Sequence, residues 1–317
     1  MERNLALELV RVTEAAALAS SRWMGKGDGR DADHAACEAM AIAIKSVKIK
    51  GHIVFGERNP RSELSKGRIV GAGGPPEVDV AVDPLESINS VAMGRPNAIS
   101  IIAVADKGSF FDSPVQYMNK IAVGPEAAGR IDIKASPLEN LVNIADAKRT
   151  YVEDLTVCIL DRERHKELIE KVRSTGARIQ LIDDGDVSAA IAAATAGSGI
   201  DVLMGVGGAS EGVLSAAALK CAGGDFQGQL HVTNDEDVAA LKRVGFANKD
   251  QVLGIGTLVN GDRVLFAATG VTKSDILQGV QYRHGGAVTH SIVMRRRSGT
   301  IRVIQASHSF DRKPDYA

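Results

Sequence analysis

The sequence has few aromatic residues and no long apolar run. Aromatic residues make up 4% of its 317 residues, whereas alanine and glycine are abundant. Small side chains of this kind favour closely packed helices and tight turns. No stretch of 18 or more apolar residues occurs, so we expect no membrane-spanning helix and no membrane partner. The first residues are charged throughout and lack the apolar core of a signal peptide.

Cysteines are scarce, and neither sign of charge is in excess. Cys37, Cys158 and Cys221 are odd in number and far apart, which suits reduced thiols in the cytoplasm better than a disulfide framework. Lys and Arg number 38 against 39 Asp and Glu, so the net charge is -1. Nucleic acid requires a basic surface, so the charge balance argues against it as the main partner.

Apolar spacing predicts an α/β protein in two halves, residues 1–150 and 151–317. In the first half we expect a helix over 5–19, a second helix capped by Asp31 or Asp33, and strands at 52–55, 78–82 and 98–105. In the second half we expect strands at 155–160, 178–182, 201–206, 263–268, 289–295 and 300–306, and helices at 164–174, 187–196, 211–222 and 236–244. Strands that alternate with helices are typical of a parallel sheet.

Carboxylates stand at the ends of the predicted elements in the first half. Asp33 lies near the start of the second helix, and Glu57 follows a strand. Asp83 and Glu86 flank Pro84, which is expected to end another strand and leave both acids in a turn, on one face. Grouped carboxylates repel one another unless a cation lies between them, and Mg²⁺ and Mn²⁺ prefer oxygen ligands. The pattern predicts a metal site, although each acid alone also suits a solvated turn.

The segment Gly205–Gly212 follows a predicted strand and precedes a helix. Closely spaced glycines let backbone N–H groups approach an anion, but a tight strand-to-helix turn explains them equally well. The segment lacks the Lys-Ser or Lys-Thr of a P-loop and is a poor dinucleotide fingerprint, so a nucleotide-binding oxidoreductase is a minor alternative. Glu211, at the start of the helix, offers a further metal ligand.

Polar residues elsewhere in the second half, and one tyrosine before it, suit a phosphorylated sugar. Asp184 and Asp186 follow a predicted strand, where they either accept hydrogen bonds from sugar hydroxyls or cap the next helix. Arg162 and Arg164 suit a phosphate, although such a charged segment often faces solvent. Tyr117 either joins them or packs in the core.

Together these segments resemble the class II fructose-1,6-bisphosphatases of the lithium-sensitive, metal-dependent sugar phosphatase superfamily. The resemblance covers nearly the whole chain and rests on separated segments in the same order, among them IVFGE, VDVAVDPLE, YMNKIAVGPEAAG, DRERHKELI, DGDVSAA and GVGGASEGV. It implies a layered α/β/α/β/α fold with mixed sheets and flanking helices, assembled as a homodimer or homotetramer. It also implies hydrolysis of the 1-phosphate of fructose 1,6-bisphosphate in gluconeogenesis and, for some members, action on sedoheptulose 1,7-bisphosphate.

By position, the resemblance implies a site for Mn²⁺ or Mg²⁺ beside a sugar bisphosphate pocket. The implied metal ligands are Asp33, Glu57, Asp83, Glu86 and Glu211, of which Asp33, Glu57 and Glu86 also act in catalysis. The implied substrate-binding residues are Tyr117, Arg162, Arg164, Asp184, Asp186, Gly207 and Gly208. The cations would polarise the phosphoryl oxygens and activate a water for in-line attack.

Three segments depart from the family pattern. Where the family reads G-E-G-E followed by an aspartate, the shorter run Gly56–Arg61 has arginine and asparagine after its glutamate. Ser87 and Ile88 replace the glycine and threonine of D-P-x-E-G-T, and Gly29 replaces a lysine. Losing a group that positions the attacking water costs about 10²–10⁴-fold in rate. The alternative function is therefore a catalytically weakened relative that binds sugar phosphate or partners an active subunit.

Overall fold

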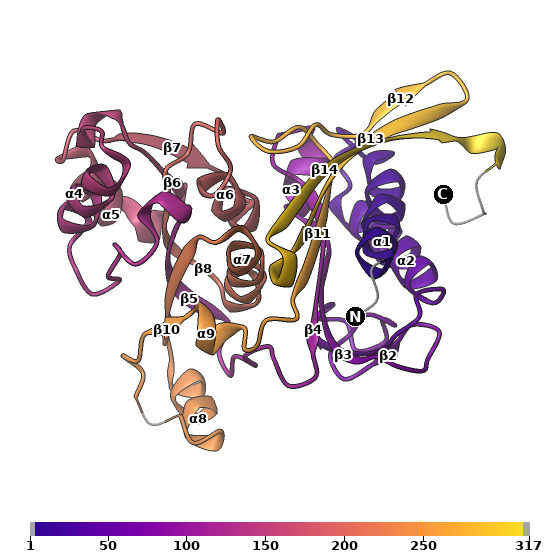
Figure 1. The fold of residues 1–317 in the computed structure, drawn as a ribbon, viewed down its shortest axis with the longest axis horizontal. Coiled ribbons are helices and arrows are strands. Elements are labelled where there is room, and N and C mark those ends of the chain that lie inside the picture. Colours follow the sequence, from indigo (N-terminus) through magenta and orange to yellow (C-terminus); the bar gives the residue numbers. More distant parts are fainter. Residues whose placement is uncertain (1–3, 247, 313–317) are drawn as a thin grey trace. The chain divides into compact units, whose positions relative to one another are not determined.

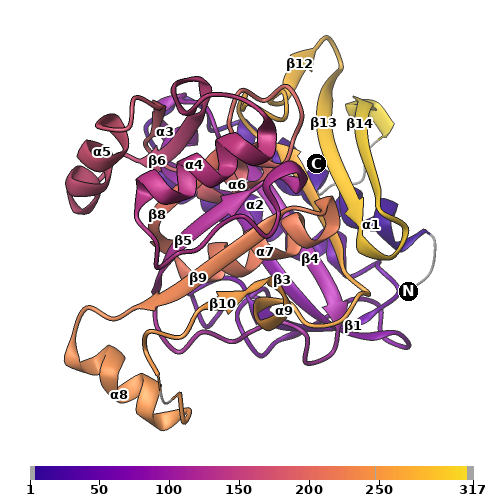
Figure 2. The ribbon, with the colours of Figure 1, turned by 60° about the vertical axis from the view of Figure 1, so that its left-hand side comes forward.

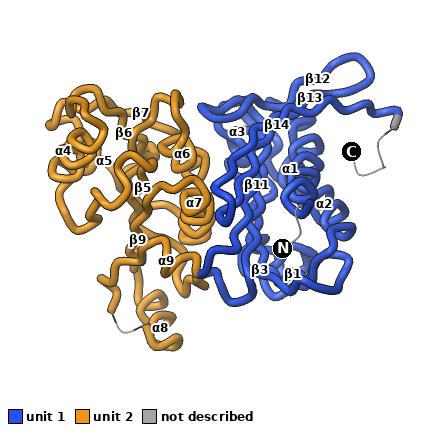
Figure 3. The backbone as a smooth tube through the Cα atoms, in the orientation of Figure 1, with its two compact units in different colours: residues 1–110, 261–317 blue, residues 111–260 orange. Residues whose placement is uncertain are grey.

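The computed structural model describes residues 4–246 and 248–312. The chain divides into two compact units, residues 1–110 with 261–317 and residues 111–260 (Figure 3). Each unit contains one mixed sheet flanked by helices (Figure 1), which confirms the expected α/β class. Among the described residues, no helix combines the length and the apolar character needed to cross a bilayer.

The first unit is an eight-stranded sheet with α1 and α2 on one face (Figure 1). Its elements are α1 (Leu5–Ser21), α2 (Gly29–Ile44), β1 (Lys50–Phe55), β2 (Ile69–Val70), β3 (Glu77–Glu86), α3 (Ile88–Met93), β4 (Ile99–Asp106), β11 (Leu265–Gly270), β12 (Gln281–Arg283), β13 (Gly286–Arg295) and β14 (Thr300–Ser309). The strand order is β12-β13-β11-β4-β3-β1-β2, with β14 paired to β13. Leu9, Val12 and Ala16 are fully buried, and their helical spacing explains why α1 lies against the sheet.

The second unit is built on a six-stranded sheet of order β10-β9-β5-β8-β6-β7. Its elements are β5 (Tyr117–Val123), α4 (Pro137–Lys148), β6 (Thr156–Leu160), α5 (Lys166–Arg173), β7 (Arg178–Ile182), α6 (Asp186–Ala193), β8 (Val202–Gly208), α7 (Ala209–Ala222), β9 (Asp225–His231), α8 (Asp235–Arg243), β10 (Leu253–Gly254) and α9 (Ile255–Leu258). Ile121 and Val123 of β5 pack in one apolar cluster with α4 and α5, whereas Met118 lies beside Gly212 of α7. Figure 2 shows α4, α5 and α7 beside this sheet. Helices therefore cover both faces of this sheet.

The structure departs from the expected organisation in two respects. The units differ from the expected halves because β5 and α4 belong to the second unit, whereas β11 pairs with β4 and returns the last segment to the first. The second sheet is mixed rather than parallel. Among the neighbouring strands described, the pairs β6–β7 and β6–β8 are parallel, whereas β5 is antiparallel to both β8 and β9. Both differences arise from pairing between strands far apart in the chain, which local periodicity does not record.

Candidate metal and substrate sites

Asp33 and Cys37 lie one turn apart on α2. The helix begins after Asp28, whose side chain accepts a hydrogen bond from the backbone N–H of Asp31 at 3.0 Å. The expected cap at Asp31 or Asp33 is therefore wrong, because the cap lies further upstream and Asp33 is inside the helix. Residues four apart share a helix face, and the Cys37 Sγ lies 3.9 Å from Oδ1 of Asp33.

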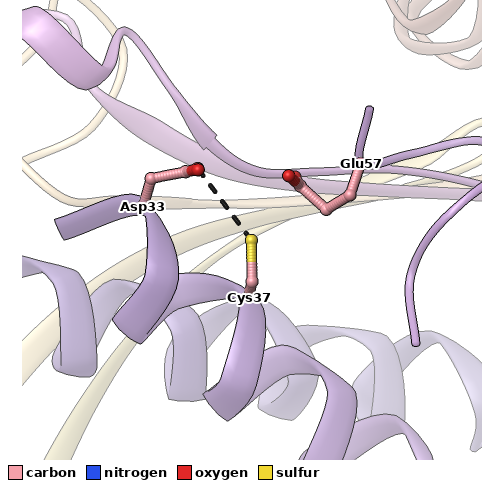
Figure 4. Close-up of side chains that lie close together, drawn as sticks. All are labelled: Asp33, Cys37 and Glu57. Atoms are coloured by element: carbon pink, nitrogen blue, oxygen red, sulfur yellow. Dashed lines mark hydrogen bonds between the residues drawn. The ribbon is translucent and has the colours of Figure 1, made fainter. Parts of the chain in front are cut away.

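Glu57 joins this pair from the segment that follows β1. Its backbone N–H donates to the carbonyl of Leu64 at 3.1 Å, which anchors the start of the loop. The preceding residue is Gly56, and a Cβ there would collide with the same carbonyl oxygen. Figure 4 shows Asp33, Cys37 and Glu57 turned toward one another, and one ligand atom of each lies within 4.8 Å of the others.

The charged forms of these three side chains repel one another in the structure. Burial raises the pKa of Asp33, and burial together with the charge of Asp33 raises the pKa of Glu57. Burial and the carboxylates of Glu57, Asp33 and Asp83 raise the pKa of the Cys37 thiol. A cation would offset this repulsion. Two carboxylates and a sulfur are ligands that divalent metals accept, so the donor set fits a metal ion.

Asp83 and Glu86 stand on a strand rather than in a turn. The strand β3 runs past Pro84 and ends only at Glu86, so the expected end of the strand at Asp83-Pro84 is wrong. The pairing of β3 with β4 shifts between Asp83 and Glu86, and a bulge of this kind accommodates a proline. The two acids therefore share no helical face. Asp83 is half-buried and Glu86 is 4% exposed, and their part in metal binding stays a prediction.

Glu86 is followed by Ser87 and Ile88, where the family pattern has a glycine and a threonine that orients the attacking water. Ser87 has a φ of 70° and a ψ of 51°, the left-handed conformation that favours glycine. Its buried hydroxyl has no hydrogen-bond partner among the described residues. Ile88 packs against the hydrophobic core of the first unit and offers no hydroxyl.

The Asp33–Cys37–Glu57 group opens onto a cavity of about 780 Å³ in the first unit. Its walls come from α2 and from the loop after β1, where Asn59 and Arg61 line it. Arg58 and Arg61 are both exposed. The group is thus accessible from solvent through this cavity.

In the second unit, Arg164 is fixed beside Tyr117. Its guanidinium donates two hydrogen bonds to the carbonyl of Val206, at 3.1 and 2.8 Å, and lies 5.8 Å from the centre of the Tyr117 ring. Tyr117 and Gly208 are paired across β5 and β8. The structure therefore brings together Tyr117, Arg164 and the glycine-rich segment, and their part in binding substrate stays a prediction.

The carboxylates of Asp186 and Glu211 lie close to two glycines at the end of β8. A Cβ at Gly207 would collide with the carboxylate of Asp186, and one at Gly208 with that of Glu211. The close approach explains why these positions are glycine. Burial raises the pKa of Asp184, and the charges of Asp186 and Glu211 add to this effect. Glu211 belongs to this group in the second unit, and its part in the metal site stays a prediction.

Asp186 has a partner that the sequence did not reveal. Its Oδ2 accepts a hydrogen bond from Nζ of Lys120 at 2.5 Å, and the two side chains are 9% and 1% exposed. Asp186 is not a helix cap, because α6 is preceded by Gly185, whose φ is 93°. A lysine within the apolar run of β5 was the available signal, since a buried lysine needs a counter-charge.

Comparison with known proteins assigns the chain to a family. The family model described as bacterial fructose-1,6-bisphosphatase, glpX-encoded, matches residues 3–308. The chain belongs to this family. Two relatives are each named D-fructose 1,6-bisphosphatase class 2/sedoheptulose 1,7-bisphosphatase. The protein of Microcystis aeruginosa is 43% identical over 342 residues, which covers 100% of this chain and 99% of the relative. That of Synechococcus elongatus is 41% identical over 337 residues and covers 98% of both. The family is one of metal-dependent phosphatases, which agrees with the acid-lined opening in the first unit.

Proposed function

We propose that this chain is a metal-dependent phosphatase that hydrolyses the 1-phosphate of fructose 1,6-bisphosphate and also accepts sedoheptulose 1,7-bisphosphate. The observation that carries the proposal is the Asp33–Cys37–Glu57 group on an open cavity, in a chain that matches its relatives from end to end. We also place the enzyme in the cytoplasm, where its three cysteine thiols would stay reduced, and expect a homodimer or homotetramer.

The residues of the first unit that would hold Mn²⁺ or Mg²⁺ are Asp33, Glu57, Asp83 and Glu86, and Glu211 remains a predicted ligand in the second unit. The ion, when bound, supplies a Lewis acid for the phosphoryl oxygens and lowers the pKa of a bound water. The protein's own contribution is to keep Asp33 and Glu57 close together in a half-buried opening. There their mutual repulsion favours cation binding.

The residues that would bind the sugar phosphate lie in the second unit. Arg162 and Arg164 carry the donors that recognise phosphate, and Arg164 is held in place by Val206. Asp184 and Asp186 would accept hydrogen bonds from sugar hydroxyls. Gly207 and Gly208, which end β8 beside the carboxylates of Asp186 and Glu211, would complete this pocket.

The test is phosphate release from both bisphosphates with Mn²⁺ or Mg²⁺, before and after the metal is removed with a chelator. We expect release that is lost on chelation and restored by the ion. Glu57→Gln should reduce kcat/KM by about 10²-fold or more, since it removes a charged ligand. The matched control is Glu63→Gln, which alters an exposed glutamate on the same loop, 2.7 Å from Lys45. Equal activity of the Glu57 and Glu63 variants would contradict the proposed metal site.

A second candidate function is supported by Ile88. An apolar residue at this position removes the hydroxyl that the family pattern provides, and favours a weakened enzyme that binds sugar phosphate or partners an active subunit. This candidate would be supported if calorimetry shows that fructose 1,6-bisphosphate binds while no phosphate is released with either Mn²⁺ or Mg²⁺. Release at ordinary turnover would exclude it.

A further inference from the structure

Cys37 adds a sulfur atom to the two carboxylates of the proposed metal site. It lies one helical turn after Asp33 on the same face of α2, and Glu57 faces it from the loop after β1 (Figure 4). Its side chain is half-buried and lines the 780 Å³ cavity, so an entering ion can reach it. In contrast, Cys158 and Cys221 are buried, and neither belongs to the group.

The spacing of the donor atoms matches that of metal ligands. In a tetrahedral zinc site an oxygen ligand at about 2.1 Å and a sulfur ligand at about 2.3 Å lie about 3.6 Å apart. The observed separation of Cys37 Sγ and Asp33 Oδ1 is 3.9 Å, and all three donor atoms lie within 4.8 Å of one another. The observed separation of the two atoms exceeds the tetrahedral value by about 0.3 Å.

We infer that Cys37 is a third ligand of the bound cation, and that this group binds divalent ions that accept sulfur, such as Zn²⁺, Co²⁺ and Cd²⁺, more tightly than Mg²⁺. The inference rests on the proposed function, because it concerns the same metal site. Thiolates select softer transition ions, whereas Mg²⁺ is bound through oxygen and water. Coordination would release the thiol proton to solvent, since the thiolate is the ligand.

The experiment is a titration of the chelator-treated full chain with Co²⁺ in the absence of substrate. A cobalt–thiolate bond gives a charge-transfer band in the near ultraviolet, which carboxylate ligands do not give. We expect this band in the parent and in the control Cys221→Ser, and its loss in Cys37→Ser. Calorimetry should show that Cys37→Ser weakens Co²⁺ and Cd²⁺ binding by about 10–100-fold, with little change for Mg²⁺.

The titration of the parent protein can overturn the inference even if a variant fails to fold. Co²⁺ that binds tightly to the parent without a thiolate band would overturn the inference, as would an undiminished band in Cys37→Ser. Cys37→Ala provides a second variant, and thermal melting checks that each protein is folded. Phosphate release with Mn²⁺ in the absence of any thiolate band would leave the proposed function intact and refute the role of Cys37 alone. If neither Mn²⁺ nor Co²⁺ binds, the metal site itself fails.

Discussion

Gly29 and Ile88 pack directly against each other. A Cβ at Gly29 would lie 2.8 Å from Cγ2 of Ile88, so no larger residue fits without a shift. In the family pattern these two positions carry a lysine and a threonine. The two departures from that pattern are thus in contact, and a glycine gives room to a branched apolar side chain.

Ile88→Thr should raise kcat for fructose 1,6-bisphosphate by about tenfold or more, because it restores a hydroxyl that can orient the attacking water. Ile88→Val is the matched control, since it has the same shape as threonine and lacks the hydroxyl. Phosphate release at saturating substrate measures both. If the valine variant gains as much as the threonine variant, the effect comes from space and not from the hydroxyl.

Ser87→Gly should stabilise the protein by about 1 kcal/mol, because glycine adopts the left-handed conformation of Ser87 without a Cβ penalty. The same change at Ser90, inside α3, should destabilise it by about 0.5–1 kcal/mol, since glycine weakens a helix interior. Urea unfolding followed by circular dichroism gives both values. A destabilised Ser87→Gly protein would show that the buried hydroxyl has a stabilising role.

The sequence predicted the elements of this chain better than their pairing. Helix and strand periodicity located α5, β7, α6 and β8 in order, because each carries its own apolar pattern. It missed β5 and β9, whose partners lie far away in the chain. The approach of Glu57 to Asp33 was expected from the resemblance, and the structure places them together. The role of Cys37 and the partner of Asp186 were not foreseen, since both depend on which side chains face each other.

Lys120→Met should destabilise the second unit by about 3–5 kcal/mol, because it leaves the carboxylate of Asp186 buried without its cation. The double variant Lys120→Met with Asp186→Asn removes both charges and should recover part of this loss. Urea unfolding of the parent, the single variants and the double variant gives the coupling energy. Additive effects of the two changes would mean that the pair does not interact.

Gly207→Ala should reduce kcat/KM by about 10²-fold, because the new methyl group would displace the carboxylate of Asp186 and lie 2.9 Å from Nζ of Lys120. Gly254→Ala is the control, since a Cβ there meets nothing within 4 Å and its φ is -80°. Steady-state kinetics on fructose 1,6-bisphosphate compares the two variants. Similar losses in both would indicate a general effect of replacing glycine.

His165 links the start of α5 to β8 in its neutral form. Its Nδ1 lies 2.7 Å from the carbonyl of Leu160, and its Nε2 accepts a hydrogen bond from the backbone N–H of Val206 at 2.8 Å. An Nε2 that accepts carries no proton, so Nδ1 is the donor to Leu160. Burial lowers the pKa of His165 below its ordinary value of 6.5. Protonation would require Nε2 to give up its bond with Val206.

The free energy of unfolding should therefore fall as the pH drops below about 6.5, because there the unfolded chain binds a proton that the folded protein does not. His165→Phe should be less stable than the parent by about 1–3 kcal/mol near pH 7.5, since it leaves the N–H of Val206 unsatisfied. The difference in free energy of unfolding between parent and variant should narrow on acidification, because the variant has no imidazole to protonate. Urea unfolding from pH 7.5 to 5.5 measures this difference, with exposed His284→Ala as the control. A difference that stays constant over this range would show that His165 titrates equally in the folded and unfolded states.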